Sequence, residues 1–85
     1  MFEALLHWLP MLGVLVSTDL LGPLRPGGIA EAIGMSSGGT TKLVDRLERA
    51  GYVTRSHGMV EHDRRAVVVT ITDRGRDAVQ TFERV

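Results

Sequence analysis

The sequence contains no cysteine among its 85 residues. Disulfide bonds, thiol-based catalysis and thiolate metal ligands are therefore excluded. A chain without cysteine suits a reducing compartment, and we expect a cytoplasmic location.

The sequence also lacks an excess of charge of either sign, because 10 Lys and Arg residues are offset by 10 Asp and Glu residues. Domains that bind nucleic acid are often strongly basic, and this global signal is missing here. The segment from Ser36 to Arg65 carries a mild excess of basic over acidic residues. Because this excess is small, we expect the electrostatic field of the protein to steer an anionic partner only weakly. The position of the basic residues is therefore more informative than the net charge.

A hydrophobic run long enough to cross a bilayer is missing as well, although residues 4–16 are largely apolar. The run is interrupted by Pro10 and Gly13. Glu3 stands where a secretion signal would carry basic residues, and no small-residue cleavage site follows. We predict a buried helix here, rather than a membrane span or a targeting segment.

A length of 85 residues with 44% hydrophobic residues predicts one small globular domain. We expect an apolar N-terminal helical region over residues 1–21, a central region over residues 22–72 and a C-terminal helix over residues 73–85. Because the core of so small a domain is thin, stabilisation by a partner subunit is consistent with this size.

The first helical region is predicted over Phe2–Leu21. Pro10 is expected to break this helix or to begin a new one. Apolar residues stand nearly all round it, which leaves two interpretations open: the helix is central in the core, or one face packs against a second subunit. A stripe at helical spacing is formed by Leu5, Leu6, Leu9, Leu12, Val16 and Leu20.

Two shorter helices follow, separated by a turn. The first is predicted over Pro26–Ile33 and ends at Gly34. The second is predicted over Ser36–Ala50, with Ser36 as its N-cap and Gly51 as its C-terminal stop. Its inward face is expected to consist of Thr40, Leu43, Val44 and Leu47.

A β-ribbon and a last helix complete the predicted elements. The strands are predicted over Tyr52–Ser56 and Arg65–Thr72, because apolar residues alternate in the second of them. Thr72 is expected to cap a helix over Asp73–Arg84. The fold class that follows is α+β, mainly helical: a winged helix-turn-helix with a two-stranded β-wing.

The outer face of the helix over Ser36–Ala50 is the first candidate site. Small polar residues at its N-terminal end would allow close approach to DNA base edges, and cations further along would meet phosphates. A solvated helix face is the alternative. Gly38 and Gly39 each cost about 1 kcal/mol relative to alanine, which close approach to a ligand or a late helix start would explain. The candidate residues are Ser36, Ser37, Gly38, Thr41, Lys42 and Arg46.

The tip of the ribbon is the second candidate site. Arg64 and Arg65 can enter a narrow minor groove, where negative potential is concentrated. Asp63 can pair with one guanidinium group and stiffen the tip. The alternative is an ordinary charged hairpin tip that discourages pairing between sheet edges.

Other chemistries find little support. Gly34–Thr41 approaches a phosphate-binding loop, but Thr40 stands where that motif requires lysine. The group His57, Glu61, His62 and Asp63 fits no familiar zinc spacing. A serine, histidine and acid set with a recognisable nucleophile turn is also missing. We therefore expect no catalytic residue, no metal and no cofactor, and hence no enzyme.

Two motifs follow in a fixed order: L-V-D-R-L-E-x-x-G over Leu43–Gly51 and D-R-R…T-x-x-G over Asp63–Gly75. Together with the preceding helices, they closely resemble the winged helix-turn-helix core of MarR-type transcriptional regulators. Compared with the family pattern the chain is expected to be shortened at both ends. Gly38-Gly39 stands where the family usually has bulkier residues.

The resemblance implies a sequence-specific DNA-binding transcriptional regulator that acts as a homodimer on double-stranded DNA. It implies that the helix over Ser36–Ala50 enters the major groove, that Arg65 reaches the minor groove, and that Asp63 orients the arginine. The dimer is expected to form through the apolar N-terminal region and the C-terminal helix. A small-molecule effector is left open. The alternative function is a winged-helix protein–protein interaction module that does not bind DNA.

Overall fold

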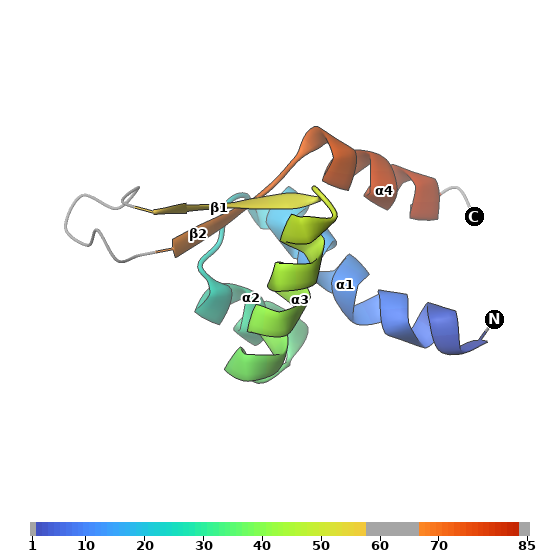
Figure 1. Ribbon diagram of the computed structural model, residues 1–85, viewed down its shortest axis with the longest axis horizontal. Coiled ribbons are helices and arrows are strands. Elements are labelled where there is room, and N and C mark those ends of the chain that lie inside the picture. Colours follow the sequence, from blue (N-terminus) through green and yellow to red (C-terminus); the bar gives the residue numbers. More distant parts are fainter. Residues whose placement is uncertain (1, 58–66, 84–85) are drawn as a thin grey trace.

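The computed structural model describes residues 2–57 and 67–83 of the chain. The ribbon β1–β2 extends to one side of the helices, and the N-terminal end of α1 and the C-terminal end of α4 lie on the other (Figure 1). The α+β, mainly helical winged-helix fold is confirmed. The elements in chain order are α1 (Phe2–Leu21), α2 (Pro26–Ile33), α3 (Ser37–Arg49), β1 (Val53–His57), β2 (Val67–Ile71) and α4 (Asp73–Glu83).

The helix α1 is continuous and passes through Pro10. The expectation that Pro10 would break or restart the helix is therefore wrong. Proline inside a helix removes one N–H bond and costs about 3 kcal/mol. Met11, Val14 and Leu15, which follow immediately, are all buried in the core. Burial of these side chains offsets the cost.

The apolar circumference of α1 is divided between the core and the surface. Met11, Val14 and Leu15 are buried, whereas Leu9 is 52% and Leu20 77% exposed. The stripe seen in the sequence therefore does not coincide with the core face: its members Leu12 and Val16 pack against the core, whereas Leu9 and Leu20 lie on the surface. Because apolar residues surround the helix, spacing alone could not identify the buried side.

The helix-turn-helix consists of α2 and α3. At Gly34 the backbone turns into the left-handed region with φ of 68°, which ends α2. Ser36 then caps α3, since its Oγ accepts a hydrogen bond from the Gly39 N–H at 3.1 Å. Because α3 begins at Ser37, a late helix start does not explain Gly38 and Gly39.

The inward face of α3 is the one predicted. Thr40, Leu43, Val44 and Leu47 are all buried. The three apolar residues among them belong to one continuous core, to which every other element contributes at least one side chain. The core comprises Met11, Val14, Leu15, Ile29, Leu43, Val44, Leu47, Val53, Val69, Ile71 and Val79.

The two strands of the wing pair antiparallel, from Val53 opposite Ile71 to His57 opposite Val67. The first strand lies one residue further along than predicted, and the second is described only from Val67. Leu24, predicted as an extended link, pairs with Val69 on the other edge of β2, through hydrogen bonds of 3.1 and 2.8 Å. The base of the wing is thus tied to the segment that leads into the helix-turn-helix.

The last helix is capped as predicted. The Thr72 Oγ1 accepts a hydrogen bond from the Gly75 N–H at 3.1 Å and donates one to the Gly51 carbonyl at 2.7 Å. A further contact joins α4 to α1, where Arg76 Nε lies 3.5 Å from an oxygen of Asp19. Across the part of the chain that the structure describes, none of the helices has the length and apolar character needed to cross a membrane.

Candidate nucleic-acid interface

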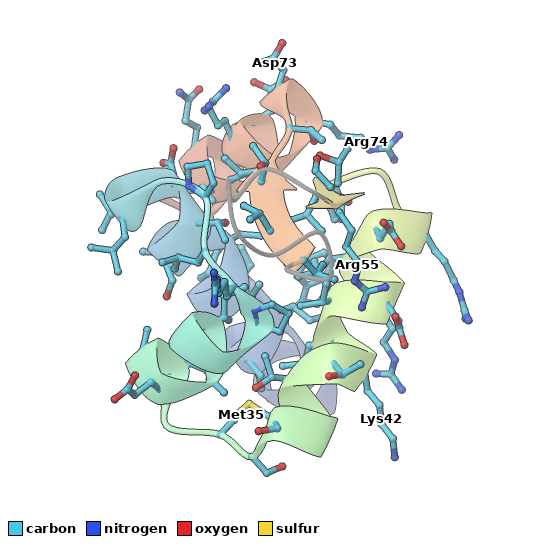
Figure 2. All side chains as sticks on the ribbon, turned by 90° about the vertical axis from the view of Figure 1, so that its left-hand side faces the viewer. Met35, Lys42, Arg55, Asp73 and Arg74 are labelled. Carbon is cyan, nitrogen blue, oxygen red and sulfur yellow. The ribbon has the colours of Figure 1, made fainter. Side chains whose placement is uncertain are left out.

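The exposed face of α3 carries the first candidate site. The helix buries one side against the core, and the six predicted residues lie away from that side. Lys42 extends away from the body of the protein in Figure 2. All six are exposed: Ser36, Ser37, Gly38, Thr41, Lys42 and Arg46. The structure therefore brings this part of the predicted site together on one surface.

Two glycines, Gly38 and Gly39, leave the backbone without side chains near the N-terminal end of this face. A Cβ atom added at Gly38 would meet nothing within 4 Å, so packing inside the molecule does not require glycine there. Gly39 differs, because an added Cβ would lie 3.1 Å from both the Met35 Cε and the Ser36 Oγ. Packing thus accounts for Gly39 but leaves Gly38 open to an external partner.

Hydroxyl groups on this face keep acceptor capacity. The Thr41 Oγ1 donates to the Ser37 carbonyl at 2.9 Å, one turn earlier in the helix. Its proton is therefore used within the helix, while its lone pairs can accept a hydrogen bond from a DNA base or a bound water.

Acidic groups on α3 are compensated from the wing. Asp45 and Glu48 stand among the basic residues of the helix, where unpaired carboxylates would repel phosphates. Arg55 on β1 pairs with both: its Nη2 lies 2.6 Å from the Asp45 Oδ1, and its Nη1 lies 3.2 Å from the Glu48 Oε1. The negative charge near the candidate interface is thereby reduced.

Arg55 is the residue that sequence reasoning missed, since it counted only as one cation in a local charge sum. Its side chain is just 21% exposed, and Figure 2 shows it lying against α3. A signal was present in the sequence: two acids three residues apart on a helix, followed closely by an arginine in the next strand. Such spacing places both acids on one helix face, but it does not reveal which residue meets them.

The second candidate site lies outside the described residues. The predicted placement of Asp63, Arg64 and Arg65 at the tip of the wing therefore stays a prediction. Glu61 and His62, considered as metal ligands in the sequence, lie there too. Within residues 2–57 and 67–83, no group of three or more His, Cys, Asp or Glu side chains is placed to hold a metal ion.

A cleft of about 460 Å³ lies beside the helix-turn-helix, between α1 and α2. It is lined mainly by apolar side chains, including Leu9, Val16, Ile33 and Met35. A second cleft of about 300 Å³ lies between α1 and α4, with Trp8, Tyr52 and Phe82 in its wall. Both volumes are within or close to the range of small-ligand pockets.

Known proteins are similar to this chain in sequence or in backbone structure. The uncharacterized HTH-type transcriptional regulator YfiV of Bacillus subtilis (strain 168) is 44% identical over 68 residues, which are 80% of this chain and 41% of that protein. The transcriptional regulator Tm0710 from Thermotoga maritima superposes with a TM-score of 0.78 at 33% identity, over 85% of this chain and 49% of that one. The chain spans less than half the length of the curated relatives it matches.

A third similar structure is that of Bordetella bronchiseptica BpsR, whose DNA binding is regulated by 6-hydroxynicotinic acid. It has a TM-score of 0.80 at 25% identity, over 86% of this chain and 51% of that one. The MarR family pattern itself matches residues 6–66, from within α1 to the wing. With its capped α3, paired wing and this match over most of its length, the chain belongs to the MarR family.

Proposed function

We propose that this chain is the DNA-reading region of a sequence-specific transcriptional regulator. The observation that carries the proposal is the exposed face of α3, where small polar residues and a bare backbone at Gly38 precede the cations. Relatives named as transcriptional regulators support this function over the alternative, a protein–protein interaction module.

In this proposal α3 enters the major groove with its N-terminal end first. Ser37, Thr41 and Lys42 meet base edges or the nearest phosphates, and Gly38 allows the duplex to approach the backbone. Arg46 binds a phosphate. Ser36 keeps its role as helix cap and contacts a phosphate at the edge of the groove.

The wing adds contacts on the neighbouring groove. Arg64 and Arg65 reach the minor groove from its tip, with Asp63 orienting the arginine that enters. The described part of the wing supports this role, since β1 and β2 extend away from the helices (Figure 1). The arginines would then read groove width rather than individual bases.

The proposal includes a homodimer that forms through α1 and α4 and acts on double-stranded DNA in the cytoplasm. Exposed apolar side chains on α1, among them Leu9, Leu20 and Leu21, support burial against a second subunit. If a small-molecule effector acts on this protein, the cleft between α1 and α2 is the first place to seek it, because it adjoins the helix-turn-helix.

The test is selection of binding sites from a random duplex library, followed by fluorescence anisotropy on the selected DNA. We expect enriched inverted half-sites whose centres lie about 34 Å, or one helical turn, apart. The affinity should fall steeply with salt, with a log–log slope of about −0.9 for each phosphate contacted.

Two variants locate the contact surface. Lys42→Ala should weaken binding and reduce the salt slope by about 0.9 if Lys42 meets a phosphate. Arg74→Ala removes one positive charge from α4, on a different element from Lys42 (Figure 2), and should leave binding nearly unchanged. The proposal is wrong if the purified protein binds no duplex in a salt-dependent way at about 50 mM salt.

A further inference from the structure

Arg55 spans three successive turns of the helix α3. Its Nη2 donates to the Thr41 carbonyl at 3.4 Å and lies 2.6 Å from the Asp45 Oδ1. Its Nη1 donates to the Glu48 Oε1 at 3.2 Å. These partners follow one another at intervals of four and three residues, along one edge of the helix. A single guanidinium group from the wing thus contacts α3 from Thr41 to Glu48.

The backbone of the same residue joins the arrangement. The Arg55 N–H donates to the Glu48 Oε2 at 3.3 Å, so both oxygens of Glu48 are bound by one residue of β1. Opposite Arg55 in the ladder stands Val69, which is itself bonded to Leu24 on its other side. Arg55 therefore sits where the wing, α3 and the entry to the helix-turn-helix meet.

Exposed ion pairs contribute little to stability, and the Asp45 and Glu48 side chains are 43% and 41% exposed. Two features nevertheless set this arrangement apart from an isolated surface pair. The Arg55 side chain is only 21% exposed and is shared by both acids. Arginine also offers several donors in a fixed plane, which restricts the directions from which its partners can approach. The contact is therefore suited to fixing an angle as well as to adding stability.

We propose that Arg55 is a positioning residue that sets the angle between the wing and the recognition helix α3, and that it contacts no DNA itself. The proposal rests on the DNA-reading function given above for the significance of that angle. Two grooves of a duplex can be engaged at once only if α3 and the wing keep a fixed relation. Loss of Arg55 would free the wing and leave Asp45 and Glu48 uncompensated beside the phosphates.

The first test needs no DNA. Because the chain contains no cysteine, spin labels can be placed at will on Ser37→Cys in α3 and Thr54→Cys in β1, both exposed positions. In the native background we expect one narrow distance distribution between the labels. Arg55→Met keeps an apolar stem of similar shape and should broaden or shift that distribution. Arg49→Met is the matched control. It removes an exposed arginine from α3 and should leave the distance distribution unchanged.

Arg55→Lys is a conservative second variant, which distinguishes loss of the planar contact from misfolding of the domain. It keeps the positive charge and the stem, but a single ammonium group cannot hold Asp45 and Glu48 in the same planar arrangement. Circular dichroism establishes that both variants fold before distances are measured. A native distribution in folded Arg55→Met and Arg55→Lys would overturn the proposal.

The second test uses a duplex selected by the native protein. Arg55→Met should lower affinity about tenfold, as expected for removal of a coupled charged contact. In the Asp45→Asn, Glu48→Gln background, which has no uncompensated carboxylate, adding Arg55→Met should leave the slope of log affinity against log salt unchanged. A slope reduced by about 0.9 would instead make Arg55 a phosphate contact and overturn the proposal. Affinity equal to that of the native protein would overturn it too.

A third variant separates angle from charge. Combining Arg55→Met with Asp45→Asn and Glu48→Gln removes the uncompensated carboxylates without restoring the link. Affinity should stay well below native, and full recovery would show that Arg55 acts only by neutralising charge. If the native protein binds no duplex, the proposed function fails, and the label distances alone still decide whether Arg55 positions the wing.

Discussion

Thr40 is a buried polar residue whose hydroxyl group has no hydrogen-bond partner among the described residues. It is fully buried on the inner face of α3, with a relative exposure of 0%. Threonine in a helix often donates its hydroxyl proton to the carbonyl one turn earlier, as Thr18 does to Val14 at 2.9 Å. Thr40 makes no such bond, so its hydroxyl has lost water without gaining a partner.

Thr40→Val should therefore stabilise the protein. Valine has nearly the same shape, so the substitution creates neither a cavity nor a clash, and both residues have similar helix propensity. An unsatisfied buried hydroxyl costs about 1–3 kcal/mol. Allowing for incomplete relief, we expect the free energy of unfolding to rise by about 1–2 kcal/mol. For a domain of this size, each 1 kcal/mol raises Tm by about 4–8 °C.

The measurement is urea unfolding followed by circular dichroism, at one fixed chain concentration because association would alter the apparent stability. Thr18→Val is the matched control. Thr18 is 2% exposed, and its hydroxyl donates to the carbonyls of Val14 and Leu15. The control should be neutral or cost about 1 kcal/mol. A denaturation midpoint for Thr40→Val at or below that of the native protein would refute the reasoning.

Three further substitutions test how the site is built. Ser36→Ala should cost about 1 kcal/mol of unfolding free energy because α3 loses its cap, with Ser37→Ala as the control; equal midpoints for the two would contradict the capping role. Gly38→Ala should raise the free energy of unfolding by up to about 1 kcal/mol, because alanine favours the helix and its Cβ meets nothing inside the molecule. The same Cβ should weaken duplex binding in anisotropy, because it would stand between the helix backbone and the DNA. Unweakened binding would show that DNA does not approach Gly38. Gly75→Ala should cost about 3 kcal/mol, because an added Cβ collides with the Tyr52 carbonyl oxygen; a thermal melt like that of the native protein would rule this out.

Local chemistry made much of the fold predictable from the sequence. Three residues mark element boundaries through their local chemistry. Glycine readily adopts the left-handed backbone that ends α2 at Gly34. The hydroxyl groups of Ser36 and Thr72 accept the hydrogen bonds that begin α3 and α4. The inner face of α3 was equally clear because its apolar residues recur at helical spacing among polar ones. These signals depend on near neighbours in the chain.

Features that depend on distant residues were not predictable. The spacing of apolar residues in α1 did not show that Leu9 and Leu20 lie on the surface, since every face of that helix is apolar. The pairing of Leu24 with Val69 joins residues 45 positions apart, and the local sequence of neither segment indicates which residue it pairs with. Arg55 belongs to the same class, because its partners lie on a different element.

The helix α3 is held from its inner side, its edge and both ends. Under the proposed function, this determines which residues of its outer face are free to contact a duplex. Ser36 fixes the first turn, and the Thr72 hydroxyl binds the Gly51 carbonyl beyond the last. Arg55 holds the edge. With orientation set by these contacts, the exposed Ser37, Gly38 and Lys42 have no side chain packed in the core. Under the proposed function, substitutions at these three positions can change which duplex is bound without unfolding the domain. Changes in sequence preference should therefore arise on this face, whereas loss of all binding should follow from damage to the contacts that hold the helix.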